Sequence, residues 1–225
     1  MIPTNPTLIF LLLFATACGN QGNTSQTAAA DKASDQKPAD QAVKNILFFG
    51  TSLTAGLGLE QSEAYPALIQ QKIDSLNLNY TVINGGLSGE TSAGGKSRID
   101  WLLKQSIDVF VLELGANDGL RGISVNETRT NLQAIIDKVK QKYPEAIMVM
   151  EGMQMPPNMG QKYTQEFKET FSLLAKKNDM IFVPFLLKNV GGIASLNQKD
   201  GVHPTAEGQK IMAETVWSKL APALK

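Results

Sequence analysis

The sequence contains a single histidine and a single cysteine among 225 residues. One cysteine cannot form a disulfide within the chain, and one cysteine with one histidine cannot supply the ligands of a common zinc site. An excess of either charge is also absent, because 21 lysine and arginine residues balance 21 aspartate and glutamate residues. Nucleic-acid-binding proteins usually show a basic excess or a basic stripe, so we expect no nucleic-acid partner.

The single histidine, His203, lies in the run DGVHPT, three residues after Asp200. Histidine titrates near neutral pH, so any imidazole base in this chain must be His203. A carboxylate on the same short loop can accept the Nδ1 proton and leave Nε2 free to take a proton from a nucleophile. The alternative is a surface histidine beside a turn, because DG and HP are ordinary turn dipeptides.

An apolar run, LIFLLLFATA, occupies residues 8–17 and ends at Cys18. At about 1.5 Å per residue the run spans roughly 15 Å, which is too short for a transmembrane helix and typical of a secretory signal. The small residues before Cys18 resemble a bacterial lipobox, so we predict a signal segment over residues 1–18 and lipidation of Cys18. The expected location is periplasmic or at the outer membrane, through a lipid anchor. The alternative is an ordinary cleaved signal that leaves a free cysteine.

Residues 19–43 are rich in small and polar side chains and contain no aromatic residue. Such a segment cannot bury enough apolar surface to offset its ordering entropy, so we predict a flexible linker. The folded domain is then expected over residues 44–225. Because 43% of the chain is apolar, this domain has enough material for a sizeable core.

Apolar runs alternate with segments of helical periodicity along the predicted domain. Strands are expected at residues 45–50, 80–85, 107–115, 146–152 and 180–185. Helices are expected at residues 63–76, 124–142, 163–177 and 205–220. Strands of nearly continuous apolar character suit a parallel sheet that is covered on both faces. The pattern predicts an α/β fold, a flavodoxin-like three-layer α/β/α sandwich with a mostly parallel five-stranded sheet.

Sites in open parallel sheets form beyond the carboxyl ends of the strands, and three candidate residues lie there. Ser52 follows the first strand, Gly89 the second and Asn117 the third. A serine at a helix start, a glycine N–H and an amide side chain can serve as nucleophile and oxyanion donors. Each also has a simpler explanation, since Ser52 could cap a helix and the other two could form turns.

The runs GTSL, SGET, GAND and DGVHPT occur in this order. Together they resemble the sequence blocks of the GDSL, or SGNH, hydrolases, and the similarity covers residues 44–223. Three longer runs are similar to the branch of arylesterases and multifunctional acyl-thioesterase/lysophospholipases: VLELGANDGLRG, MPPNMGQKYTQEF, and VPFLLKNVGG with the following LNQKDGVHPTAEGQ. The resemblance implies a serine esterase that works through an acyl-enzyme and needs no metal or cofactor.

The resemblance also implies a role for each motif residue. Ser52 is then the nucleophile, His203 the general base and Asp200 the residue that orients the base. The oxyanion hole is then made by the N–H groups of Ser52 and Gly89 and by the side-chain amide of Asn117.

Two departures and two alternatives accompany this resemblance. Thr51 stands where the family name requires aspartate, so we expect altered hydrogen bonding around the turn but little loss of chemistry. The alanine of GAND is a second small difference. Ser88, in GLSG, is a rival nucleophile. An α/β-hydrolase is the rival fold, but its G-x-S-x-G turn surrounds neither serine.

Two loops are expected to bind the substrate, one containing Leu120 and the other containing Met155 and Pro157. Flexible thioethers suit a surface that accommodates varied acyl chains, although each methionine could instead fill a gap in the core. We expect a monomer that acts on a small acyl ester or a lipid, with aryl esters, thioesters and lysophospholipids all compatible. The alternatives are an acyltransferase or a sugar-ester deacetylase that uses the same site, and a binding lipoprotein without catalysis.

Overall fold

A computed structural model describes residues 42–224 of the chain. They form one five-stranded sheet of order β2-β1-β3-β4-β5, in which all neighbouring strands are parallel. The strands are β1 (Lys44–Gly50), β2 (Tyr80–Asn84), β3 (Val109–Glu113), β4 (Ile147–Glu151) and β5 (Ile181–Val183). Cys18, the predicted signal segment and nearly all of the predicted linker lie outside the described residues.

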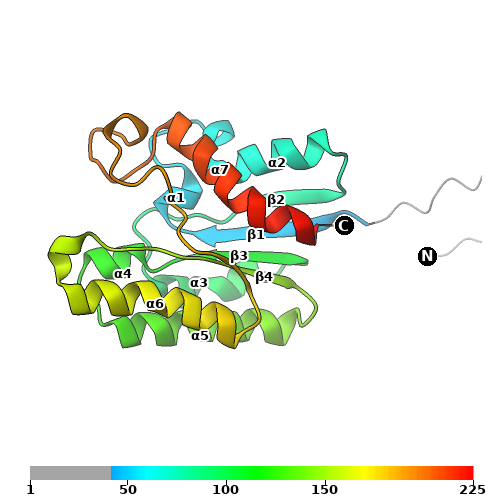
Figure 1. The fold of residues 1–225 in the computed structure, drawn as a ribbon. Coiled ribbons are helices and arrows are strands. Elements are labelled where there is room, and N and C mark those ends of the chain that lie inside the picture. The colour runs from blue at the N-terminus through cyan, green and yellow to red at the C-terminus, as the bar shows by residue number, and fades with distance from the viewer. Residues whose placement is uncertain (1–41, 225) are drawn as a thin grey trace, which may run out of the picture. The chain divides into compact units, whose positions relative to one another are not determined.

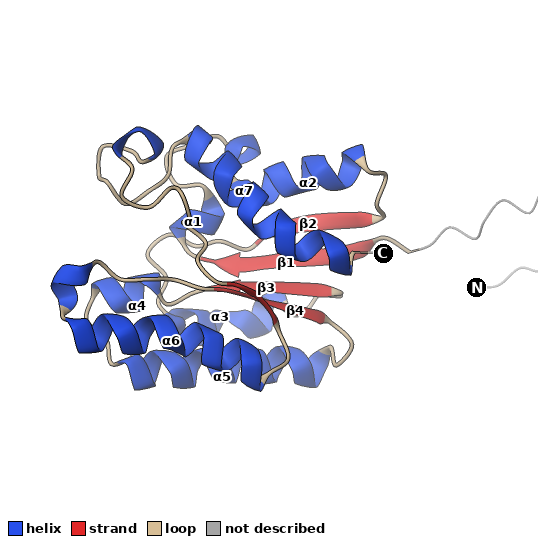
Figure 2. Ribbon diagram, in the orientation of Figure 1, coloured by secondary structure: helices blue, strands red, loops and turns tan. Residues whose placement is uncertain are grey.

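Helices cover both faces of the sheet (Figure 1, Figure 2). On one face lie α2 (Tyr65–Ser75) and α7 (Ala206–Leu220), and on the other lie α3 (Ser92–Leu102), α5 (Val125–Lys142) and α6 (Gln161–Lys177). Two short helices, α1 (Ser52–Ala55) and α4 (Ala116–Leu120), follow β1 and β3. Single 3-10 turns occur at Gln61–Glu63, Pro157–Met159, Ala194–Leu196 and Ala221–Ala223. The predicted three-layer α/β/α sandwich is confirmed.

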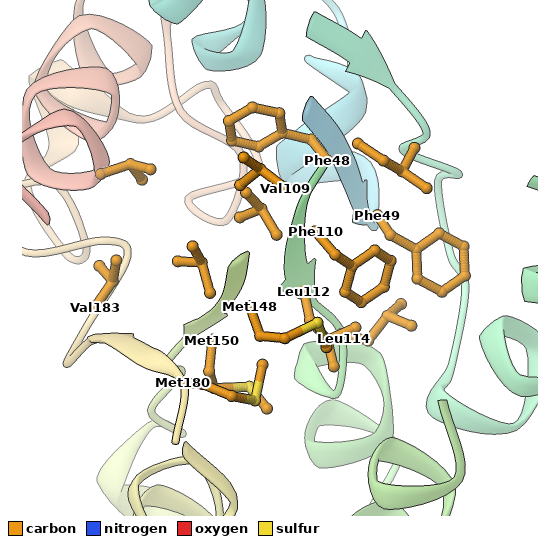
Figure 3. Packing of buried hydrophobic residues seen from close by; sticks show 14 of the residues in the cluster. Phe48, Phe49, Val109, Phe110, Leu112, Leu114, Met148, Met150, Met180 and Val183 are labelled. Carbon is orange, nitrogen blue, oxygen red and sulfur yellow. The ribbon is translucent and has the colours of Figure 1, made fainter. Parts of the chain in front are cut away.

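The central strand β1 is buried on both faces, and residues 46–49 have no exposed surface. Successive side chains of a strand point to opposite faces of the sheet. Phe48 accordingly packs edge-on against Tyr65 of α2, whereas Phe49 lies beside Phe110 of β3 with 5.9 Å between ring centroids (Figure 3). Burial on both faces explains why the strands read as continuous apolar runs in the sequence.

Two strands, β3 and β5, are at least three residues shorter than the apolar runs that predict them. The expected strand over residues 107–115 extends too far, because Gly115 adopts a φ of 114° that ends the extended conformation. β5 stops at Val183, directly before Pro184, which has no N–H to donate to a neighbouring strand.

Helix α3 is the long helix that periodicity does not predict, because its sequence SAGGKSRIDWL has two adjacent glycines and few apolar residues. Thr91 caps it by accepting a hydrogen bond from the N–H of Gly94 at 3.3 Å. A Cβ at Gly95 would overlap the side chains of Leu114 and Phe49, so glycine lets α3 approach the sheet. Close packing, rather than an amphipathic pattern, defines this helix.

The loops after the strands meet at the carboxyl edge of the sheet, as parallel strands require. The chain crosses to opposite sides of β1 to form β2 and β3, which makes the space between β1 and β3 a topological switch point. Gly50 at the end of β1 pairs with Glu113 at the end of β3 there. At the opposite edge of the sheet β1 begins and α7 ends (Figure 1).

Replacing Gly95 with valine should lower the free energy of unfolding by about 2 kcal/mol, because the added side chain overpacks the contact between α3 and the sheet. The matched control is Ala93→Val, an exposed position of the same helix, where only a few tenths of a kcal/mol are expected from helix propensity. Urea unfolding of both variants measures the difference. Equal losses would show that α3 does not depend on close approach at Gly95.

Candidate active site

Ser52 is the first residue of α1 and lies two positions after the end of β1. Thr51 is the cap of this helix, because its Oγ1 accepts the N–H of Leu53 at 3.4 Å. The helix ends after four residues at Gly56, which has a left-handed φ of 72°. The capping role therefore belongs to Thr51, and the hydroxyl of Ser52 is available for another partner.

That partner is His203, whose Nε2 lies 2.9 Å from Ser52 Oγ. His203 Nδ1 lies 2.7 Å from Asp200 Oδ2. The rival nucleophile Ser88 is exposed and makes no hydrogen bond to His203 among residues 42–224. The structure thus brings the three predicted residues Ser52, His203 and Asp200 into one chain of hydrogen bonds.

The second carboxylate oxygen of Asp200 fixes the loop around the imidazole. Oδ1 accepts the backbone N–H groups of Val202 at 2.9 Å and His203 at 3.0 Å. Hydrogen bonds from the backbone and side chain of His203, and from the backbone of Val202, hold the pKa of Asp200 well below its usual range. Asp200 is therefore a carboxylate at neutral pH, which favours the imidazole tautomer that keeps its proton on Nδ1.

The predicted oxyanion donors lie on the adjacent loops after β1, β2 and β3. Asn117 Nδ2 donates one hydrogen to the carbonyl of Glu90 at 2.9 Å, which leaves the second amide hydrogen for another acceptor. Among residues 42–224 the backbone N–H groups of Ser52 and Gly89 find no acceptor. Gly89 has a φ of 77°, a conformation that favours glycine.

Two arginines hold the loop that contains Gly89. Arg98 donates to the carbonyl of Gly85 at 2.9 Å and forms an ion pair with the buried carboxylate of Glu90. Arg121 Nη2 donates to the carbonyl of Gly89 at 3.0 Å. The loop is thus fixed from both sides, which keeps its N–H groups in place without help from a substrate.

A cleft of about 480 Å³ opens beside Ser52 and His203. The three predicted substrate-binding residues, Leu120, Met155 and Pro157, all line it. Sequence patterns did not single out three further apolar lining residues, Phe185, Leu187 and Val202. Sequence signals existed, because Val202 lies beside His203 and the other two lie in the run VPFLLKNVGG.

Two glutamates near the site were also missed by sequence reasoning. Glu113 ends β3 and accepts hydrogen bonds from the N–H of Thr51 at 2.7 Å and from its hydroxyl at 2.9 Å. Glu151 ends the neighbouring strand β4 and, like Glu113, has no exposed surface. A sequence signal existed, because each acidic residue closes an apolar strand run. Thr51, which stands where the family name has aspartate, thus hydrogen-bonds to Glu113 through both its N–H and its hydroxyl.

Within residues 42–224 no group of three histidine, cysteine, aspartate or glutamate side chains could hold a metal ion. No helix in the same range is long and apolar enough to cross a membrane.

Fold and site together define a class of protein: an α/β/α enzyme with the geometry of a serine hydrolase. The turn that carries Ser52 follows the first strand and lacks the G-x-S-x-G sequence of an α/β-hydrolase. The model of the GDSL-like lipase/acylhydrolase family matches residues 48–211. The chain therefore belongs to this family, as the sequence motifs predict.

Curated relatives agree with this assignment. Esterase TesA of Pseudomonas aeruginosa is 36% identical over 81% of this chain and 90% of its own length. The arylesterase of Vibrio mimicus is 35% identical over 83% of this chain and 92% of its own length. Thioesterase 1/protease 1/lysophospholipase L1 of Escherichia coli is 35% identical over 80% of this chain and 85% of its own length. The chain is a serine ester hydrolase.

Solved structures agree as well. The crystal structure of TesA superposes with a TM-score of 0.77 at 36% identity and covers 80% of this chain and 100% of that chain. The esterase AlinE4, of the SGNH-hydrolase family, superposes with a TM-score of 0.66 at 39% identity and covers 81% of this chain and 97% of that chain.

Asp200→Asn should lower kcat roughly 10³- to 10⁴-fold. The amide oxygen would keep the two backbone N–H groups that Oδ1 now accepts, which would turn the amide NH₂ toward His203 Nδ1. The imidazole would then carry its proton on Nε2 and could not accept one from Ser52. Ester hydrolysis, with circular dichroism to check the fold, measures the effect. A loss below 10-fold would contradict a role for Asp200 in setting the tautomer.

Proposed function

We propose that the chain hydrolyses carboxylic esters through an acyl-enzyme on Ser52, with His203 as general base and Asp200 as the residue that orients it. The observation that carries this proposal is the unbroken hydrogen-bond chain from Ser52 to Asp200 at the mouth of an apolar cleft. Such a chain lets an imidazole remove the hydroxyl proton as the oxygen attacks.

The proposed reaction has two halves. Ser52 Oγ attacks the ester carbonyl carbon while His203 Nε2 takes its proton, and the N–H groups of Ser52 and Gly89 and the amide of Asn117 stabilise the oxyanion. The carbon–oxygen bond to the alcohol then breaks, and His203 returns the proton to the leaving alcohol. Water, deprotonated by His203, attacks the acyl-enzyme and releases the acid and Ser52.

We propose esters with an apolar acyl chain as the substrate class. The cleft volume of about 480 Å³ falls within the range of small-molecule sites. Met155 lies where a side chain at Gly119 would be, so the glycine makes room for a thioether in the cleft wall. Leu120 and Pro157 add further apolar surface. Aryl esters, acyl thioesters and lysophospholipids, which the names of the relatives mention, are candidates.

We also propose that the domain spans residues 44–225, acts as a monomer, and is exported and held at a bacterial membrane by a lipid on Cys18, with residues 19–43 as the linker. The support is the apolar run before Cys18 and the polar composition after it. Mass spectrometry of the protein isolated from membranes tests the lipid directly, because a diacylated amino terminus adds a defined mass to Cys18.

Ser52→Ala and His203→Ala should each lower kcat roughly 10⁴- to 10⁶-fold without unfolding the protein. A p-nitrophenyl ester series from acetate to palmitate measures the rates, and Ser88→Ala is the matched control with unchanged activity. Fluorophosphonate labelling that Ser88→Ala keeps and Ser52→Ala loses would identify Ser52 as the nucleophile. A variant at Ser52 or His203 that keeps a tenth of the wild-type rate would overturn the assignment. Added alcohol that collects the acyl group faster than water does would favour an acyltransferase.

Met155→Ala should shift the preferred acyl chain to greater length, because it removes a side chain from the cleft wall. We expect kcat/KM for the longer esters to rise about 10-fold relative to acetate, the scale of one or two methylene groups in an apolar pocket. Met159→Ala is the control, since Met159 lies on the same loop but does not line this cleft. An identical chain-length profile for Met155→Ala and wild type would remove Met155 from the acyl site.

A further inference from the structure

A fully buried polar cluster lies directly behind the nucleophile turn. Thr51, Thr54, Tyr65, Glu113 and Glu151 have exposures of 1% or less. Three oxygen–oxygen contacts join four of these residues in a line. Glu113 Oε2 lies 2.8 Å from Thr54 Oγ1, Thr54 Oγ1 lies 3.0 Å from Tyr65 Oη, and Tyr65 Oη lies 2.9 Å from Glu151 Oε2.

Counting hydrogens shows that at least one of the two glutamates carries a proton. Each of the three contacts needs one hydrogen, but the hydroxyls of Thr54 and Tyr65 supply only two. With both carboxyls ionised, one contact would bring two oxygen lone pairs together without a hydrogen between them. The third hydrogen must therefore come from a carboxyl group at one end of the line, either Glu113 or Glu151.

The donors around each carboxyl decide which end is charged. Glu113 accepts the N–H of Thr51 at 2.7 Å, the hydroxyl of Thr51 at 2.9 Å and the hydroxyl of Thr54 at 2.8 Å. Glu151 has Tyr65 as its one hydrogen-bond partner, and its Oε1 has none within the described residues. A buried carboxylate needs several donors, so the negative charge belongs on Glu113 and the proton on Glu151.

The acidities of the two groups agree with this assignment. Burial raises the pKa of Glu113 to about 7, and its hydrogen bonds with Thr51 and Thr54 limit the rise. Burial, reinforced by the charge of Glu113, raises the pKa of Glu151 well above its usual range. Tyr65 is the other titratable group that faces the pair, and burial raises its pKa as well. Above pH 7 the pair therefore holds one charge.

This charge acts on the backbone that presents Ser52. The N–H of Thr51 is bound to Glu113, and the carbonyl of Thr51 accepts the N–H of Ala55 at 3.0 Å. The backbone N–H and carbonyl of Thr51 are thus both hydrogen-bonded, and the peptide group that follows carries the N–H of Ser52. Fixing Thr51 fixes the direction of that N–H and the start of the nucleophile turn.

We propose that Glu113 is a positioning residue that works as a carboxylate, and that a one-way hydrogen-bond chain from neutral Glu151 through Tyr65 and Thr54 maintains it in that state. The effect on catalysis rests on the proposed function, because it acts through the N–H and hydroxyl of Ser52. The assignment of the proton to Glu151 is independent of the proposed function.

Two isosteric variants of the full chain separate the two glutamates. Glu151→Gln should keep kcat within about twofold, because the glutamine NH₂ donates to Tyr65 as the carboxylic acid does. Glu113→Gln should lower kcat roughly 10- to 100-fold, because it removes the carboxylate that aligns the turn. KM should change little in both variants, since neither glutamate lines the cleft. Equal losses of kcat in the two variants, or a larger loss in Glu151→Gln, would overturn the proposal.

Infrared spectroscopy at pH 8 tests the proton without reference to activity. The wild-type protein and Ser52→Ala should both show the C=O band of a protonated carboxylic acid, which is lost in Glu151→Gln and kept in Glu113→Gln. No band in the wild type, or a band that survives in Glu151→Gln, contradicts the assignment. If Glu113→Gln does not fold, the spectra of the wild type and Glu151→Gln still decide whether Glu151 carries the proton. An active Ser52→Ala variant would instead refute the proposed function while leaving the infrared result intact.

Discussion

The hydrogen bond between Ser52 and His203 joins residues 151 positions apart in the chain, and the rest of the structure serves to keep its two ends together. Ser52 follows the buried strand β1, and His203 lies in the loop before α7. Gln209 of α7 connects them, because its side chain accepts the N–H of Tyr65 at 2.8 Å and donates to the carbonyl of Leu53 at 3.2 Å. The helix that follows the histidine is thus bound to the turn that carries the serine.

Two fully buried glutamates, Glu113 and Glu151, lie beside the apolar core at the carboxyl ends of β3 and β4. Burying an ionised carboxylate costs several kcal/mol unless donors surround it. Glu113 meets this condition through Thr51 and Thr54, and Glu151 avoids it by remaining neutral. This pair of glutamates therefore holds one buried charge at the point where the backbone positions the turn that carries Ser52. Aspartate at position 51, as the family name describes, would set a second negative group against Glu113.

The fold was predictable because the strands of a parallel sheet that is covered on both faces have nearly continuous apolar sequences. Ser52, Asp200 and His203 were predictable as a group because short motifs at strand ends carry them. Helix α3 was not predictable, because the reason for glycine at position 95 is a close contact with residues that are distant in the sequence. The roles of Glu113 and Glu151 were hidden for the same reason, since two acidic residues 38 positions apart become neighbours only when β3 pairs with β4. The part of the cleft wall that follows β5, with Phe185 and Leu187, could likewise be recognised only in the folded chain.

The direction of β1 also places the two ends of the described domain away from the cleft. β1 begins at the edge of the sheet where α7 ends, and its last residue leads to Ser52 at the other edge (Figure 1). A cargo, a surface or a second protein joined at either end of the domain therefore meets the edge remote from the cleft. For a tethered catalyst this is a favourable arrangement, because the same sheet that holds the serine also keeps its support out of the path of the substrate.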